Sequence, residues 1–331
     1  MALIRHNPVL ELRPFGFNNL GATCYFNAVL QSLLSCTSFI HYLLKNRKNP
    51  EYNENPVTRK LIELVDMALN MRDGDMSSNS ISQMSPNIWI EMIKFLCKKN
   101  NMKINNFMNG QQCAGEGFDY LIDSLENFED IQDIFTHRYK TTVYCIDCDK
   151  CVSNVNSTNF VFKVPPNLKN EQLDRFKKYD KLIDENYENT KEHNQESKNN
   201  KSEMNKLLTR QTGYIDKFYI CPECKQGGEK YSIDHLVMSP EILVVLSKKY
   251  VANNKLDIYT DFPKTLEFNG KDSILKYEAV SQIEHSGGLN GGHYWAISRR
   301  HNGWYSLNDN QFTKSEFNPT KNTYIVFYHL M

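Results

Sequence analysis

In the first third of the chain, apolar residues recur at the three- and four-residue spacing of amphipathic helices. The best-defined helix is predicted from Cys24 to about Cys36, behind Thr23, whose hydroxyl is a suitable N-cap. Two more are predicted over Pro56–Met71 and Pro86–Lys99, because each pattern opens on a proline, which fits the first turn of a helix. A fourth is predicted over Gln111–Phe128, with a first turn weakened by two glycines.

From about Arg138 the pattern changes to short runs of β-branched and aromatic residues, which are typical of strands. The clearest runs are Tyr139–Tyr144, Asn159–Val164, Ile242–Ser247 and Thr323–Tyr328. Helices followed by strands predict an α+β fold. Between two of the predicted helices, Asp73–Ser85 is expected to form a loop.

One segment does not fit either pattern. Lys169–Lys206 contains nine basic and nine acidic residues and few aliphatic ones. Such a segment buries too little apolar surface to offset its ordering entropy. We therefore expect a mobile charged insertion, spanning 167–212, within one larger domain.

Composition narrows the class of protein. The chain has 331 residues with 40% apolar content, enough for a sizeable core, and 39 basic residues balance 39 acidic ones. Zero net charge argues against nucleic acid or a membrane surface as partner. No apolar run approaches the roughly 18 residues of a membrane span, and the polar N-terminus is unlike a signal peptide. Nine cysteines, an odd number in a long chain, favour a reducing compartment, cytoplasm or nucleus.

Cys24 stands at the start of a predicted helix, where unpaired N–H groups and the macrodipole favour a thiolate. The residues on both sides of Cys24 give a second indication that it is a catalytic residue. The run Gly16–Gln31 resembles the cysteine box of the ubiquitin-specific proteases, which are papain-like deubiquitinating enzymes. Gly291–Ala296 with Trp304–Asp309 resembles the histidine box of that family, and Tyr324–Tyr328 resembles its last strand.

The resemblance implies a papain-like cysteine peptidase with a helical lobe, an antiparallel β lobe and a zinc-ribbon finger extension. It implies one catalytic domain over 1–331, with a helical thumb at 1–137, fingers at 138–247 and a β palm at 248–331. The implied activity is thiol-dependent hydrolysis of the bond after the C-terminal glycine of ubiquitin or a ubiquitin-like protein. The conjugates of that modifier would be the partners of a monomeric enzyme.

Such a hydrolase needs a nucleophile, an imidazole to take and return its proton, a group that orients the imidazole, and a donor for the oxyanion. Cys24, His293, Asn308 and Asn19 are expected to fill these roles, the last by resemblance alone. Asn308 and Asp309 compete for the orienting role, since only one of two successive strand residues can face the imidazole. We assign it to Asn308 and expect Asp309 to lie near the oxyanion or water.

The hairpin between the two motifs has two candidate registers. A two-residue turn at Asn302–Gly303 would place Asn308 opposite Ile297, away from His293. A loop centred on Arg300–His301 would place Asn308 opposite His293, and the chemistry favours this register.

Six further residues are expected to contact the substrate: Gln31, Gln112, Glu116, Gly291, Gly292 and Tyr294. Gly291 and Gly292 would border a narrow channel for the Gly-Gly tail of ubiquitin, because residues without side chains let another backbone approach. Glu116 matches an acidic position that contacts basic residues of the tail. The sequence departs from the family at Cys113, where Asp is usual, and at Gly117, where Phe is usual, so one acidic contact is missing.

Two CxxC pairs, Cys145 with Cys148 and Cys221 with Cys224, offer four thiolates for one structural zinc ion. They lie 73 positions apart, so two hairpin tips must meet in space. Cys148 and Cys151 form an alternative first pair, and the resemblance favours Cys145 with Cys148. A redox pair or a metal-free finger are the competing interpretations.

A second hypothesis is a scaffold of the same fold that binds ubiquitin without turnover. The departures in the tail-binding motif favour it, and the complete set of Cys, His and Asn argues against it. A zinc-ribbon protein that binds nucleic acid is disfavoured by the zero net charge.

Overall fold

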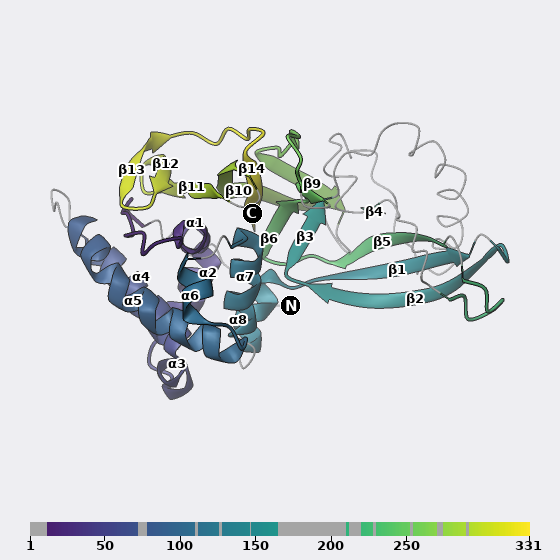
Figure 1. The fold of residues 1–331 in the computed structure, drawn as a ribbon, viewed down its shortest axis with the longest axis horizontal. Helices are drawn as coiled ribbons and strands as arrows, with labels where there is room; N and C mark the ends of the chain where they lie inside the picture. Colours follow the sequence, from purple (N-terminus) through teal and green to yellow (C-terminus); the bar gives the residue numbers. More distant parts are fainter. Residues whose placement is uncertain are drawn as a thin grey trace.

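The computed structural model describes residues 12–71, 78–109, 112–125, 128–145, 147–164, 210–211, 220–227, 230–251, 254–269, 274–288 and 291–331. Within these ranges the helices precede the strands and gather at one end of the molecule (Figure 1). The helices are α1 (Cys24–Leu33), α2 (Thr37–Asn46), α3 (Pro50–Glu54), α4 (Pro56–Leu69), α5 (Ser78–Lys99), α6 (Ile104–Asn109), α7 (Ala114–Asp123) and α8 (Glu129–Phe135).

The central element is an eight-stranded sheet with the order β13-β12-β11-β10-β14-β6-β3, in which β9 also pairs with β10. Its strands are β3 (Val161–Val164), β6 (Ile242–Ser247), β9 (Thr265–Asn269), β10 (Ile274–Gly287), β11 (Gly292–Arg300), β12 (Gly303–Asn308), β13 (Gln311–Ser315) and β14 (Thr323–Leu330). The pairs are antiparallel except for β3 with β6, which is parallel. The predicted antiparallel β lobe thus contains one parallel pair.

Both faces of this sheet are covered at its middle. In β6, Val244 packs in the core shared with the helices, whereas Leu243 and Val245 pack in a second core on the opposite face. Successive strand residues point to opposite faces, so a strand buried on both sides needs an unbroken apolar run. For this reason the unbroken apolar run Ile242–Ser247 predicted a strand clearly. The observed strand β6 has the same bounds.

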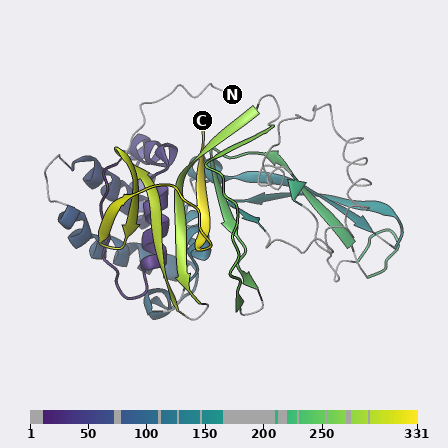
Figure 2. The ribbon, with the colours of Figure 1, turned by 90° about the horizontal axis from the view of Figure 1, so that it is seen from above.

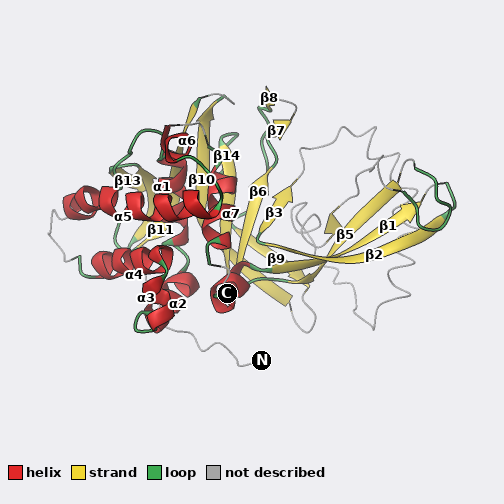
Figure 3. Ribbon diagram, turned by 60° about the horizontal axis from the view of Figure 1, so that its bottom comes forward, coloured by secondary structure: helices red, strands yellow, loops and turns green. Residues whose placement is uncertain are grey.

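A four-stranded sheet with the order β2-β1-β5-β4 extends away from the helical end (Figure 3). It consists of β1 (His137–Cys145), β2 (Lys150–Asn159), β4 (Arg210–Gln211) and β5 (Lys230–Met238). A small hairpin of β7 (Tyr250–Val251) and β8 (Asn254–Lys255) follows β6. The range 138–247, predicted as fingers, therefore contributes strands to both sheets, and the charged insertion lies outside the described residues except for Arg210–Gln211.

The structure corrects several predicted helix boundaries. The helix predicted from Pro86 begins at Ser78, so Pro86 lies inside it and the second half of the predicted loop Asp73–Ser85 is helical. Burial of Ile81 on this added turn explains the extension, because tertiary packing outweighs the lost hydrogen bond of a proline. The first predicted helix ends at Leu33 rather than Cys36, and the fourth covers only Ala114–Asp123.

The pairing of β11 with β12 matches neither predicted register. Arg300 pairs with Gly303, so the loop is His301–Asn302, and Asn308 lies one step beyond the pair of Ala296 with Leu307. Positive φ angles of 67° at Asn302 and 133° at Gly303 close the turn. The observed register lies midway between the two candidates. In it, each residue of β12 faces a β11 position two residues away from the one that either candidate gave, so every side chain stays on the same face of the sheet.

The helix α1 packs on the sheet at β10 and β11 and also contacts α7 (Figure 2). Among the described residues, no helix has the length and apolar character needed to cross a membrane.

Candidate active site and metal centre

Cys24 is the first residue of α1 and lies where that helix meets the sheet. It is 7% exposed, and its sulfur lies near the backbone N–H of Tyr294, the neighbour of His293 on β11. Burial raises the pKa of the Cys24 thiol, the Tyr294 amide opposes that shift, and the negative charge of Asp309 adds to it. The backbone N–H groups of Cys24 and Tyr25 at the start of α1 favour the thiolate, as expected, but burial outweighs them, so a base must take the thiol proton.

The imidazole of His293 faces the end of β12. Its Nε2 lies 2.6 Å from Oδ1 of Asn308, whereas Oδ2 of Asp309 is 4.0 Å away. The observed strand register makes His293 and Asn308 diagonal rather than direct neighbours, and long side chains bridge that distance. The structure thus brings together His293 and Asn308, as the sequence predicted, although the strand register differs from both candidates.

Asp309 is held by two side-chain amides, one from α1 and one from the loop before it. Asn27 Nδ2 donates to Oδ1 at 2.8 Å, and Asn19 Nδ2 donates to Oδ2 at 3.0 Å. The backbone N–H of Phe17 also donates to the carbonyl of Asp309 at 2.8 Å, which ties the segment before Cys24 to the turn after β12. Asn19, expected as oxyanion donor, is exposed and lies at this junction.

Thr23 does not cap α1 through its side chain. Its hydroxyl instead accepts from the backbone N–H of Leu20 at 2.9 Å and donates to Oδ1 of Asn19 at 3.2 Å. Thr23 is the N-cap residue, as predicted, but its hydroxyl bonds to the preceding loop rather than to the first turn of the helix. Asn27 was not among the predicted site residues. The only sequence signal for it was a polar residue on the apolar face of a helix.

Gln31 does not lie where a substrate could reach it, since it is 2% exposed. Its Nε2 donates to the carbonyl of Phe15 at 2.8 Å, and its Oε1 accepts from the guanidinium of Arg300 at 2.7 Å. Arg300 is fully buried and also donates to the Gln31 carbonyl at 2.8 Å and to Ser35. The prediction of Gln31 as a substrate-binding residue is therefore wrong for this structure: its side chain fastens the end of α1 to β11.

The remaining candidates for substrate contact surround the start of β11. Glu116 is exposed on the first turn of α7, Gly291 and Gly292 are exposed, and Gln112 is half-buried just before α7. Tyr294 is buried in the core that also contains Cys24, and its ring packs near Tyr324. These placements leave the exposed residues as predictions for substrate binding.

Two glycines near the site stand where the packing leaves no room for a side chain. A Cβ on Gly292 would lie 2.3 Å from Nε2 of His285, and one on Gly117 would lie 2.9 Å from the ring of Tyr25. Gly117, one of the two departures from the family, thus makes room for Tyr25. At the other departure, Cys113 Sγ lies 2.9 Å from the hydroxyl of Tyr324.

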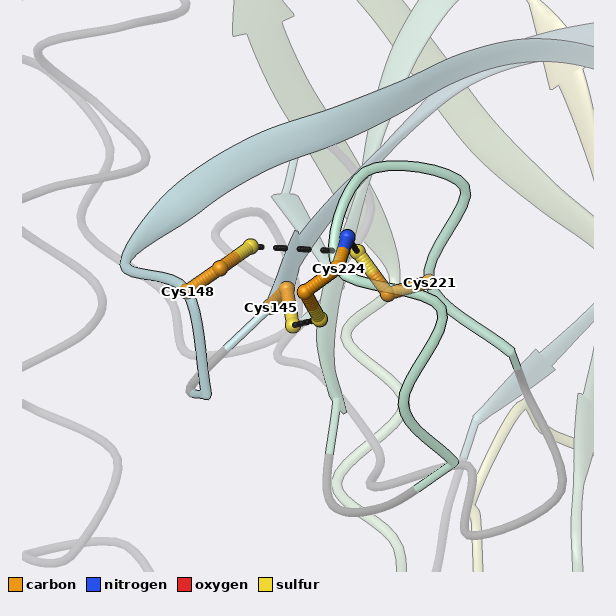
Figure 4. Close-up of side chains that lie close together, drawn as sticks. All are labelled: Cys145, Cys148, Cys221 and Cys224. Atoms are coloured by element: carbon orange, nitrogen blue, oxygen red, sulfur yellow. Dashed lines mark hydrogen bonds between the residues drawn. The ribbon is translucent and has the colours of Figure 1, made fainter.

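Four cysteines meet at the far end of the four-stranded sheet (Figure 4). The sulfurs of Cys145, Cys148, Cys221 and Cys224 all lie within 4.8 Å of one another. Cys145 to Cys224 and Cys148 to Cys221 are both 3.8 Å apart, which is about the edge of a tetrahedron of sulfurs ~2.3 Å from one ion. Cys145 and Cys148, the first pair that the resemblance favours, both belong to this cluster, which could hold a metal ion.

The fold and the site define a cysteine hydrolase of papain-like type. A family model described as ubiquitin carboxyl-terminal hydrolase matches residues 15–328, and the chain belongs to that family. The predicted family, its α+β fold and the class of activity, a thiol-dependent ubiquitin hydrolase, are confirmed.

Individual relatives agree with the family match. The chain is 25% identical over 321 residues to ubiquitin carboxyl-terminal hydrolase 12 of Salmo salar, which covers 89% of this chain and 80% of that protein. It is 22% identical to ubiquitin carboxyl-terminal hydrolase 8 of Saccharomyces cerevisiae, over 95% of this chain and 70% of the yeast protein. A solved structure of a SAGA deubiquitinating module bound to monoubiquitin matches with a TM-score of 0.65 at 19% identity, covering 99% of this chain and 72% of that one.

Gln31→Ala is expected to lower the free energy of unfolding by about 2 kcal/mol, because the buried guanidinium of Arg300 loses an acceptor. KM for a ubiquitin substrate should not change, since the side chain is buried. Chemical denaturation and steady-state kinetics measure the two quantities. Gln311→Ala, an exposed change of the same kind, is the control and should leave stability unchanged. A raised KM with unchanged stability would restore Gln31 to the substrate site.

Alkylation of Cys24 by iodoacetamide requires the thiolate, so its rate as a function of pH reports the pKa of that thiol. Burial raises this pKa, so the half-maximal rate is expected above the pH of about 8.5 found for free cysteine. Asp309→Asn removes a negative charge that opposes ionisation, and the midpoint should move to lower pH. Asp257→Asn, an exposed carboxylate paired with Lys321, should leave it in place. Mass spectrometry of the Cys24 peptide measures the rates, and an unmoved midpoint in Asp309→Asn would contradict the assignment.

Proposed function

We propose that this protein hydrolyses the bond after the C-terminal glycine of ubiquitin or a ubiquitin-like protein, through a thioester on Cys24. The observation that carries the proposal is the convergence of three residues from distant parts of the chain. The Cys24 sulfur lies against the backbone of Tyr294, and the adjacent His293 is hydrogen-bonded to Asn308 at 2.6 Å.

The hydrogen bond to Asn308 fixes which ring nitrogen can act as base. Oδ1 of Asn308 is an acceptor, so Nε2 of neutral His293 carries the hydrogen and Nδ1 carries the lone pair. Nδ1 then takes the proton of the Cys24 thiol as sulfur attacks the carbonyl carbon, and returns it to the leaving amine. Water, activated by the same nitrogen, hydrolyses the thioester and regenerates the thiol.

Negative charge develops on the carbonyl oxygen in both steps and needs a fixed donor. Asn19 is exposed, and its Oδ1 accepts from the backbone N–H groups of Gly21 and Thr23 at 3.2 and 3.1 Å. Its Nδ2 therefore points the other way, where one N–H bonds Asp309 and the second can reach an oxyanion. Losing such a donor typically costs about 2.7–4 kcal/mol of transition-state stabilisation.

Ubiquitin with a C-terminal thiol-reactive group tests the proposal directly. The wild-type protein is expected to form a covalent adduct, and Cys24→Ala should form none. Asn308→Ala should lower kcat for a fluorogenic ubiquitin amide about 10²-fold, because a freely rotating imidazole loses its role as general base. Asp309→Ala should lower it less.

Three outcomes would overturn parts of this proposal. If wild type reacts only with the probe of another modifier, ubiquitin is not the substrate. If no modifier reacts, the protein is the catalytically inactive binding scaffold. If Asp309→Ala abolishes turnover while Asn308→Ala spares it, the orienting role belongs to Asp309.

We also propose that the four-cysteine cluster holds one structural zinc ion. The fit of the sulfur spacing to a tetrahedron supports it, and four protein ligands leave no open position for catalysis. The cysteines whose side chains are described are all free thiols, which fits a reducing compartment such as the cytoplasm or nucleus. A monomeric state is likewise our expectation.

Protein purified without chelator should contain one zinc ion per chain by elemental analysis. Cys221→Ser is expected to lose the metal and to lower the melting temperature, because the ion joins two separate segments of the sheet. Cys97→Ala, a buried thiol in the helical core, is the control and should keep the zinc. Absence of zinc from the wild-type protein would contradict the assignment.

A further inference from the structure

Trp89 lies on α5, in a region that no catalytic motif of the sequence includes. It is fully buried, and its indole Nε1–H donates to Oδ1 of Asn27 at 2.7 Å. Its ring packs edge-on against Phe17 and Phe26, with centroids 4.5 and 6.0 Å apart. The indole therefore connects the α5 side of the core to the helix that carries Cys24.

The direction of this hydrogen bond determines the orientation of Asn27. An indole N–H can only donate, so the accepting oxygen of Asn27 must face Trp89. Nδ2 of Asn27 then faces the other side, where it donates to Asp309 Oδ1 at 2.8 Å and to the carbonyl of Asn18 at 3.3 Å. A flipped Asn27 amide would place donor against donor at Trp89 and acceptor against acceptor at Asp309.

Asp309 passes this orientation to Asn19. A carboxylate only accepts, and with Oδ1 taken by Asn27, Oδ2 takes the N–H of Asn19 at 3.0 Å. On its other side, Oδ1 of Asn19 is occupied by the donors of Gly21 and Thr23. The donor and acceptor roles along the hydrogen bonds from Trp89 to Asn19 can therefore be assigned in only one way. This assignment leaves one N–H of Asn19 directed outward.

We propose that Trp89 is a positioning residue for the hydrolysis, acting through Asn27 and Asp309 to hold the outward N–H of Asn19 in the oxyanion-binding orientation. This inference rests on the proposed function. Without the indole N–H, the buried oxygen of Asn27 has lost its donor, and its amide can rotate away from Asp309. Asp309 and Asn19 would then sample several orientations, and the donor to the oxyanion would be misaligned for part of the time.

Trp89→Phe keeps an aromatic ring between Phe17 and Phe26 and removes only the donor. With a fluorogenic ubiquitin amide, kcat is expected to fall roughly tenfold, part of the 10²–10³-fold effect of losing an oxyanion donor. KM should stay unchanged, because Trp89 is buried and touches no substrate. Trp304→Phe removes an indole N–H from the palm side of the sheet, where the ring packs on Phe317, and should leave kcat unchanged.

A second substrate separates oxyanion stabilisation from a general structural defect. Ubiquitin with a C-terminal alkyne captures the thiol by forming a carbon–sulfur bond, and no negative oxygen develops. Trp89→Phe should therefore lower amide hydrolysis but leave the rate of alkyne capture unchanged. Equal loss of both reactions, or loss of neither, would overturn the proposal.

The double variant identifies the route. In the Asn19→Ala background, Trp89→Phe should cost little further activity, since the group that it positions is gone. A full additional tenfold loss would mean that Trp89 does not act through Asn19.

An NMR readout keeps this inference distinct from the proposed function. The Trp89 indole N–H resonance should move upfield in Asn27→Ala as its acceptor is lost, while the Trp304 resonance stays in place. If wild type neither hydrolyses nor captures ubiquitin, the proposed function fails, and this shift alone judges the hydrogen-bond chain. An unmoved Trp89 resonance would overturn the chain even in an active enzyme.

Discussion

The site depends on one packing constraint, the docking of α1 against β10 and β11. Sulfur and imidazole come from residues 24 and 293, so only a fixed contact between this helix and this strand brings them together. At the Cys24 end, the backbone N–H of Tyr294 lies near the sulfur and lowers the pKa of the thiol. At the other end the contact is a polar fastening, in which buried Arg300 binds the Gln31 carbonyl and side chain.

The buried guanidinium of Arg300 is stabilised by acceptors at the end of α1. The guanidinium of Arg300 meets the C-terminal end of α1, where unpaired carbonyls carry partial negative charge. Ser281 adds a second polar joint, since its hydroxyl donates to Ser32 of α1 at 2.8 Å and lies 2.6 Å from Ser298 of β11. Hydrogen bonds prevent a helix from sliding on a sheet better than apolar contacts do, because they form only within narrow ranges of distance and angle.

At the Cys24 end of α1, proton transfer likewise depends on groups that are held in fixed orientations. A buried thiol with a raised pKa is a poor nucleophile at rest, and Asp309 makes its ionisation harder. The acceptor for its proton must therefore be oriented in advance, which the bond between His293 and Asn308 does. Asp309, although close to His293, has its two carboxylate oxygens hydrogen-bonded to Asn19 and Asn27, which fits the supporting role that we propose for it.

The sequence by itself determined the class of protein and singled out Cys24 and His293 as candidate nucleophile and base, because long motifs surround both residues. It also determined β6, since a strand buried on both faces must be continuously apolar. Only the tertiary structure decided the register of the β11–β12 hairpin, where turn chemistry offered several closely spaced solutions. The structure kept His293 and Asn308 within reach because all of those solutions preserve the alternation of faces. It also decided that Gln31 fastens the helix and that Asn27 bonds both Trp89 and Asp309, since a polar residue on an apolar helix face gives no sign of its partner. Such partners come from elements far apart in the chain, and only the packed core brings them within hydrogen-bonding distance.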